Sequence, residues 1–100
     1  MGQWDRLHVL EPEQIKVYAE RTPEWETNED YLRRAFEFTN FVEAFSFMTE
    51  VAAISEELDH HPDWSNSWNK VDITVTNHQA GGITEIDFVL CEMINGLVAQ

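Results

Sequence analysis

A change of hydrophobic period in the middle of the chain constrains the fold more than any other feature. Apolar residues first recur at helical intervals of three to seven residues, at Phe41, Phe45, Met48, Ala52 and Leu58. Further along, Val71, Ile73 and Val75 alternate with polar residues, which is the pattern of a strand with one buried face. A helix and a one-sided strand in one short chain predict an α+β fold, because each covers the apolar face of the other.

The helical pattern has recognisable ends. Asn40 followed by Glu43 has the form of an N-cap and its reciprocal partner, so the helix is expected to begin there. It should end around Leu58, because Pro62 disfavours helical geometry for the residue before it. The polar residues that follow favour a loop; they are Asp63, Ser65 and Asn66.

The first third of the chain predicts a short helix and a hairpin. A helix is expected over residues 11–21, where Pro12 fits the first turn and Pro23 prevents continuation. Residues 25–27 and 31–38 predict a β-hairpin whose second strand is rich in aromatic residues.

The end of the chain predicts a turn and a last helix. Gly81 and Gly82 mark the turn, and Thr84 with Asp87 repeats the capping pattern. The apolar stripe of this helix consists of Phe88, Cys91, Ile94 and Leu97. The order of these elements predicts one α+β domain over residues 1–100.

The charge of the chain excludes several classes of partner. Its 100 residues include 19 Asp and Glu against six Lys and Arg, a formal net charge of −13 at pH 7. A field of that sign repels phosphate backbones and anionic headgroups, so direct nucleic-acid and membrane-surface binding are disfavoured. The single cysteine, Cys91, excludes an intrachain disulfide and a cysteine-based zinc site. Short apolar runs and an N-terminus without an apolar signal core predict a soluble cytoplasmic protein.

Three of the four histidines fall beside the predicted long helix and the alternating strand. His60 and His61 follow the helix, and His78 follows the strand. Histidine exchanges protons near neutrality, which suits general acid/base catalysis. If the strand runs back alongside the helix end, His78 meets His60 across a cleft. Glu56 lies one helical turn before His60, where a carboxylate would orient the imidazole or raise its pKa. Trp64 and Trp68 would supply flat walls for a planar ligand.

Structural roles for the same residues compete with these functional ones. A His-His pair in a polar loop is more often solvated or capping, and a lone Trp64 more often packs in the core. Three imidazoles and a water would make a zinc site, but adjacent histidines rarely reach one ion and the usual i,i+4 spacing is missing. His8 is expected at the surface. The phenylalanines are expected in the core: Phe36, Phe38, Phe41, Phe45 and Phe47.

A set of residues with defined spacing links these segments. Its members are Glu56, His60, His61, Pro62, Trp68, His78 and Asp87. The stretches ELDHHPDW (57–64), WNKV (68–71), HQAGGITE (78–85) and FSFMT (45–49) accompany it. Together they resemble the signature of the pterin-4a-carbinolamine dehydratase family over residues 36–94. Spacing at many points is far more specific than any single motif.

The resemblance implies an architecture and an assembly. Members of this family have a four-stranded antiparallel sheet with helices packed on one face. The residues themselves account for three strands, and the fourth is expected in a longer segment around Trp25 or near the N-terminus. Family members associate as dimers or tetramers through sheet edges and helices, so a homodimer or homotetramer is expected.

The resemblance also implies an activity. The family removes water from a 4a-hydroxytetrahydropterin and yields the quinonoid dihydropterin, which recycles the tetrahydrobiopterin used by aromatic amino acid hydroxylases. This reaction needs no metal and no cofactor. His60 and His78 would transfer the protons at the C4a hydroxyl and at N5, in an order left open, and His61 would position the substrate. Glu56 would tune His60, and Trp64 would border the pterin.

Two further positions support the site. Asp87 fits both the cap of the last helix and the family signature, and the two roles are compatible. Asn77 stands where the family usually has Thr or Ser directly before the third histidine. Because the neighbouring backbone is expected to bind the pterin ring, this substitution bears on pterin selectivity.

A function of another class remains as the alternative. Some members of the family act as dimerisation partners of a homeodomain transcription activator, and others resemble assembly factors for a carbon-fixing enzyme. A protein of that kind would have the same fold and a protein partner. The joint presence of Glu56, His60, His61 and His78 favours catalysis, because a scaffold has no chemical need to hold them together.

Overall fold

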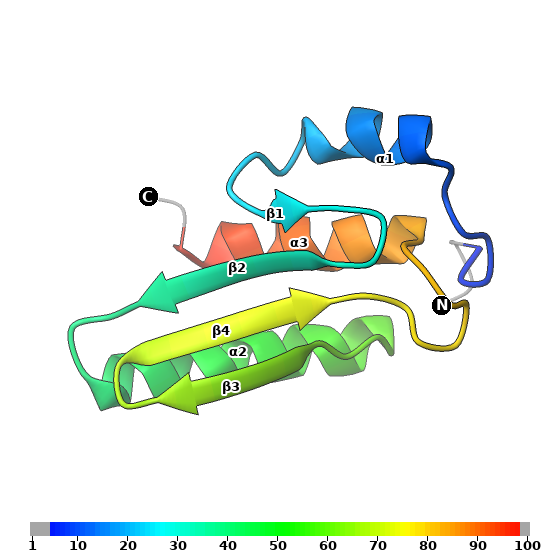
Figure 1. The fold of residues 1–100 in the computed structure, drawn as a ribbon. Helices are drawn as coiled ribbons and strands as arrows, with labels where there is room; N and C mark the ends of the chain where they lie inside the picture. Colours follow the sequence, from blue (N-terminus) through cyan, green and yellow to red (C-terminus); the bar gives the residue numbers. More distant parts are fainter. Residues whose placement is uncertain (1–4, 99–100) are drawn as a thin grey trace.

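Four antiparallel strands form one sheet with the order β1-β2-β4-β3 in the computed structural model, which describes residues 5–98 (Figure 1). The strands are β1 (Glu26–Thr27), β2 (Leu32–Glu37), β3 (Asp63–Ser67) and β4 (Lys70–Val75). The helices are α1 (Pro12–Ala19), α2 (Phe41–Leu58) and α3 (Glu85–Val98). The α+β fold with a four-stranded antiparallel sheet is confirmed. None of the helices described is both long and apolar enough to cross a membrane.

One face of the sheet holds the core. β4 keeps the predicted alternation, and Val71, Ile73 and Val75 are each at most 1% exposed. Both α2 and α3 pack against β4 and against each other on the same side of the sheet (Figure 1). α1 lies next to α3, where the rings of Tyr18 and Phe88 stack with centroids 5.2 Å apart. The helices therefore cover one face of the sheet.

The fourth strand lies where the sequence favoured a loop. β3 is an edge strand, so it needs backbone hydrogen bonds only to β4, and most of its polar side chains stay at the surface. Trp64 is its one apolar residue, and it packs against the core. The loop predicted from Asp63, Ser65 and Asn66 is therefore wrong, and the fourth strand is found here rather than around Trp25 or near the N-terminus.

α2 has the predicted ends but buries a different face. The Asn40 side chain accepts a hydrogen bond from the N–H of Glu43 at 2.9 Å, and the helix ends at Leu58. Its buried residues are Ala44, Phe47, Val51, Ser55 and Leu58. Phe41 and Phe45 are 47% and 55% exposed, so the stripe predicted from Phe41 and the core placement of both rings are wrong. The helix carries two apolar stripes, and packing decides which one is buried.

The start of α3 follows the sequence closely. The N–H of Thr84 donates to Asp87 Oδ2 at 2.7 Å, which confirms the reciprocal half of the predicted capping pattern. The Thr84 hydroxyl donates to the same oxygen instead of accepting from the Asp87 N–H. Phe88, Cys91 and Ile94 on the following turns are fully buried. The capped helix start thus fixes the place of Asp87 in the interior.

Candidate active site

Three histidines lie at one end of the sheet, where α2 ends, β3 begins and β4 ends (Figure 1). β3 and β4 are antiparallel with Asp63 opposite Thr74, so the residues just before β3 and just after β4 come together. His60 and His61 belong to the first segment, and His78 belongs to the second. The structure therefore gathers the three predicted histidines into one region.

His60 is oriented by a buried carboxylate. Its Nε2 lies 2.6 Å from Asp87 Oδ1, with 10% of the His60 side chain and none of the Asp87 side chain exposed. The other oxygen, Asp87 Oδ2, accepts hydrogen bonds from the N–H of Thr84 at 2.7 Å and from its hydroxyl at 3.1 Å. Asp87 therefore caps α3 and orients His60 at the same time, as the sequence allowed.

Glu56 contacts His61 rather than His60. Its Oε2 lies 2.7 Å from His61 Nε2, and both side chains are more than half exposed. The predicted pairing with His60 is wrong because Asp59 adopts a left-handed conformation, with φ of 54°, and ends the helix. After this turn the His60 side chain reaches the buried Asp87, and His61 takes the place beside the last turn of α2.

His78 pairs with Asp63, a residue that the sequence did not single out. The His78 Nε2 lies 2.7 Å from Asp63 Oδ2, and the side chains are 75% and 60% exposed. Asp63 is the first residue of β3, so its place beside His78 depends on a strand that the hydrophobic pattern does not reveal. His78 also lines a hollow of about 240 Å³ together with Asp30, Thr76, Asn77, Gly81 and Gly82. This hollow does not include His60, and the cleft between the two histidines stays a prediction.

The three histidines share one chemical arrangement. Each places Nε2 beside its own carboxylate, so Nδ1 is the nitrogen that remains to accept or give a proton. Two imidazoles arranged in this way at one site can supply an acid and a base to one substrate. Within residues 5–98, the His, Cys, Asp and Glu side chains form no group of three or more that could hold a metal ion.

Trp64 and Asn77, the two other residues predicted for the site, make contacts that support the fold. Trp64 lies opposite Ile73 in the sheet and packs against the core. Asn77 is 6% exposed; its Nδ2 donates to the carbonyl oxygen of Arg6 at 2.6 Å, and its Oδ1 accepts from the N–H of Ala80 at 3.0 Å. The Asn77 side chain thus builds the turn after β4. Direct contact of either residue with a pterin stays a prediction.

The chain matches known proteins along nearly its whole length. A family model described as pterin 4 alpha carbinolamine dehydratase matches residues 8–97. A protein of Prochlorococcus marinus (strain NATL2A), provisionally named a pterin-4-alpha-carbinolamine dehydratase, is 44% identical over 92 residues. The match covers 92% of this chain and 97% of the relative.

Two solved structures are also similar. The crystal structure of a transcriptional coactivator/pterin dehydratase from Brucella melitensis has a TM-score of 0.87 and 31% identity, and the match covers 92% of this chain and 100% of that one. A pterin dehydratase-like protein identified as a RuBisCO assembly factor in the alpha-carboxysome shares the fold, with a TM-score of 0.62 and 18% identity over 98% and 99% of the two chains. The matched range contains the residues of all three histidine–carboxylate pairs. The chain belongs to the pterin-4-alpha-carbinolamine dehydratase family.

Proposed function

We propose that this chain removes water from a 4a-hydroxytetrahydropterin, the 4a-carbinolamine, and yields the quinonoid dihydropterin in tetrahydrobiopterin recycling. One observation carries the proposal: His60 and His78 reach the same end of the sheet, and each is oriented by its own carboxylate. Imidazoles held in this way suit acid/base catalysis, whereas a protein that only binds a partner has no chemical need of them. Membership of the family supports the same reaction.

The reaction needs one acid and one base. An acid protonates the hydroxyl on C4a, the bond between C4a and oxygen breaks, and water leaves. A base removes the proton from N5, and the electron pair of that N–H bond completes the double bond between N5 and C4a. We assign the two transfers to His60 and His78 without fixing which histidine is the acid. Exchange of one proton with solvent returns both imidazoles to their starting states.

The remaining residues support this chemistry. Asp87 holds His60, and His61 with Glu56 positions the substrate at the open side of the site. In this proposal Trp64 borders the pterin at the sheet edge, and Asn77 shapes the backbone next to His78. We place the reaction in the cytoplasm, a reducing compartment with which the single free cysteine is compatible.

The ultraviolet spectrum of freshly generated 4a-hydroxytetrahydropterin tests the proposal. The protein should accelerate dehydration equally with and without a chelator. His78→Ala should slow the catalysed rate by about 100-fold. His8→Ala, which removes an exposed histidine outside the three pairs, should behave as the unmodified protein. No acceleration, or acceleration that the chelator abolishes, would refute a metal-free dehydratase.

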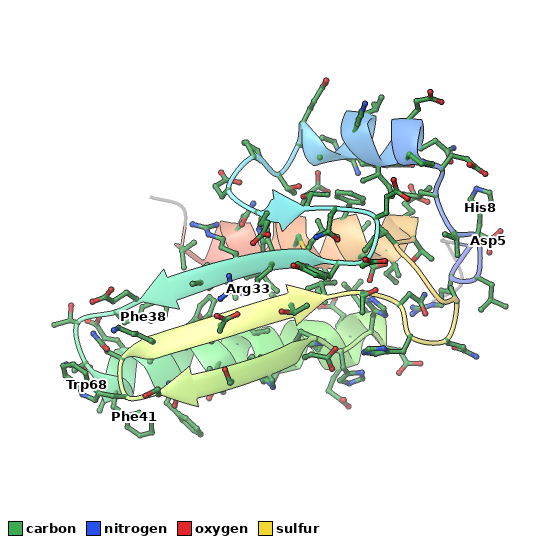
Figure 2. The ribbon with its side chains drawn as sticks, viewed as in Figure 1. Asp5, His8, Arg33, Phe38, Phe41 and Trp68 are labelled. Atoms are coloured by element: carbon green, nitrogen blue, oxygen red, sulfur yellow. The ribbon has the colours of Figure 1, made fainter. Side chains whose placement is uncertain are left out.

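A role in protein association is the second candidate, and the exposed apolar face of α2 favours it. Phe41, Val42 and Phe45 are 47%, 71% and 55% exposed. Phe41 and Trp68 lie at the opposite end of the molecule from His8 (Figure 2). A cluster of exposed apolar side chains is typical of an interaction surface.

We propose that a homodimer or homotetramer covers this face, and that a different protein partner is the alternative occupant. Sedimentation of the unmodified protein should give the mass of a dimer or tetramer, and Phe45→Asp should shift it towards the monomer. A monomeric unmodified protein would contradict the homo-oligomer, and a pull-down with the chain as bait would then test the alternative.

A further inference from the structure

The segment before α1 contacts the turn that follows β4. Asp5 and His8, on either side of Arg6, lie at the end of the molecule that the loop after β4 reaches (Figure 2). The N–H of Leu10 donates to the carbonyl oxygen of Ile83 at 2.8 Å. This bond fixes the segment to the start of α3 independently of Arg6.

The Arg6 side chain closes the carboxyl end of α2. Its Nη1 donates to the carbonyl oxygen of Asp59 at 2.9 Å, and its Nη2 donates to that of Leu58. α2 has no basic residue in its own last turn, so a guanidinium from a distant segment satisfies these carbonyl groups. Asp59 directly precedes His60, and the contact therefore fixes the peptide from which His60 projects.

The Arg6 backbone holds the other histidine-bearing loop. Its carbonyl oxygen accepts a hydrogen bond from Asn77 Nδ2 at 2.6 Å. Asn77 directly precedes His78, and its own carbonyl accepts the N–H of Gly81 at 2.9 Å in the turn. Arg6 thus contacts the neighbour of His60 through its side chain and the neighbour of His78 through its backbone.

A second series of hydrogen bonds joins the same loops. Asn77 Nδ2 lies 3.3 Å from Thr84 Oγ1, the Thr84 hydroxyl donates to Asp87 Oδ2 at 3.1 Å, and Asp87 Oδ1 holds His60. The two N–H groups of the Asn77 amide can serve Arg6 and Thr84 at once. The hydrogen bonds of residues 5–98 include none between His60 and His78, so the two loops are joined through these intermediates.

We propose that Arg6 is a positioning residue that holds the loops of His60 and His78 at a defined spacing. The inference rests on the proposed function, because it takes these histidines as the acid and the base. Both imidazoles must reach one pterin ring, and misplacement by about 1 Å can reduce a rate about 100-fold. Because Arg6 acts on the geometry of proton transfer, its loss should lower kcat and leave KM nearly unchanged.

Three variants test this role. Arg6→Gln, which loses the guanidinium group, should lower kcat about 10- to 100-fold and change KM by less than about twofold. Arg6→Lys keeps a charged donor and should recover part of the lost rate. Arg21→Gln is the matched control: Arg21 follows α1 and contacts Glu92 at 3.0 Å, and its loss should leave kcat unchanged. A lower melting temperature for Arg6→Gln with an unchanged kcat would show a merely structural role and overturn the proposal.

Amide hydrogen exchange tests the link between the loops without any activity. The N–H of His60 donates to the Ser55 carbonyl at 3.0 Å, and the N–H of Gly81 reports on the turn after β4. Arg6→Gln removes the side-chain contacts with Leu58 and Asp59 but keeps the carbonyl oxygen that Asn77 bonds, so it should speed exchange at His60 and leave Gly81 unchanged. Arg21→Gln should change neither position. Unchanged exchange at His60 in Arg6→Gln, or faster exchange at Gly81 alone, would overturn the link. If the unmodified protein does not dehydrate the pterin, the proposed function fails, and exchange still decides whether Arg6 joins the loops.

Discussion

His60 and His78 are oriented by carboxylates in opposite environments. Asp87 is fully buried and also bonded to Thr84, whereas Asp63 is 60% exposed and its partner His78 is 75% exposed. A buried partner with fixed neighbours is preorganised before a substrate arrives, but an exposed pair competes with water. The fold therefore fixes one side of the site and leaves the other free to adapt to the substrate.

Among substitutions of the carboxylates, the largest effect is expected from Asp87→Asn. The amide cannot orient His60 as a carboxylate does, and it weakens the cap of α3. We expect turnover to fall by about 100-fold and the free energy of unfolding to fall by about 1 to 2 kcal/mol. Rates from the ultraviolet assay and urea unfolding curves measure the two losses.

Thr84→Val is the control for this variant. It removes the hydroxyl bond to Asp87 Oδ2 and keeps the carboxylate beside His60. It should lower stability with a much smaller loss of turnover. Turnover that stays at the original level in Asp87→Asn would contradict the role of the buried pair.

Asp63→Asn should have a smaller effect on the exposed side. Water can replace part of the bond to His78, so we expect turnover to fall by about 10-fold and the free energy of unfolding to change by less than about 0.5 kcal/mol. The same two assays apply. A loss of turnover as large as that of Asp87→Asn would break the distinction between the two sides of the site.

Glu56→Gln should affect substrate binding more than turnover. Glu56 holds the exposed His61, which we assign to positioning. KM should rise about threefold with little change in kcat, because the interaction is similar in the bound and transition states. Glu57→Gln, at the exposed neighbouring position, is the control and should leave both constants unchanged. A fall in kcat with an unchanged KM in Glu56→Gln would assign His61 to proton transfer instead.

The buried Cys91 thiol makes the stability of the protein depend on pH, which tests the environment of Asp87. Burial, and then the negative charges of Asp87 and Glu92, raise the pKa of its thiol well above the usual range. As the pH rises, the thiol loses its proton in the unfolded chain before it does so in the folded one. The contribution of the thiol to the free energy of unfolding is therefore complete below the unfolded pKa, and it decreases as the pH rises above that value. The expected loss is up to about 1.4 kcal/mol per pH unit above about pH 8.5.

Urea unfolding of the original protein and of Cys91→Ala between about pH 8 and 10 measures this loss. The free energy of unfolding should fall more steeply with pH when the thiol is present. Comparison of the two slopes removes the contribution of other groups that titrate in this range. Parallel slopes would show that Cys91 ionises as readily in the folded state as in the unfolded state.

The elements that sequence reasoning found are those with a strong local signal. β4 alternates because one face is buried, and the side chains of Asn40 and Asp87 mark helix starts by accepting backbone N–H groups there. β3 has a single apolar residue and depends on pairing with β4, which no local pattern shows. The buried face of α2 depends on tertiary packing in the same way.

The site residues also divide into those with a local sequence signal and those whose contacts depend on tertiary packing. The sequence predicts the histidines because their residue type and spacing are distinctive, and Asp87 because it fits both a helix cap and the family signature. The predicted partner of Glu56 is wrong because one left-handed residue, Asp59, changes the direction of the chain after α2. No local pattern indicates the role of Asp63, because its contact with His78 exists only once β3 is paired with β4.

The most direct measurement compares the dehydration rate of a variant that carries both His60→Ala and His78→Ala with that of His8→Ala. The account predicts that the double variant loses the catalysed rate and reacts no faster than free substrate, while circular dichroism and sedimentation show the original fold and assembly. His8→Ala should retain full activity. Unchanged turnover in a folded double variant would contradict acid/base catalysis by these two histidines.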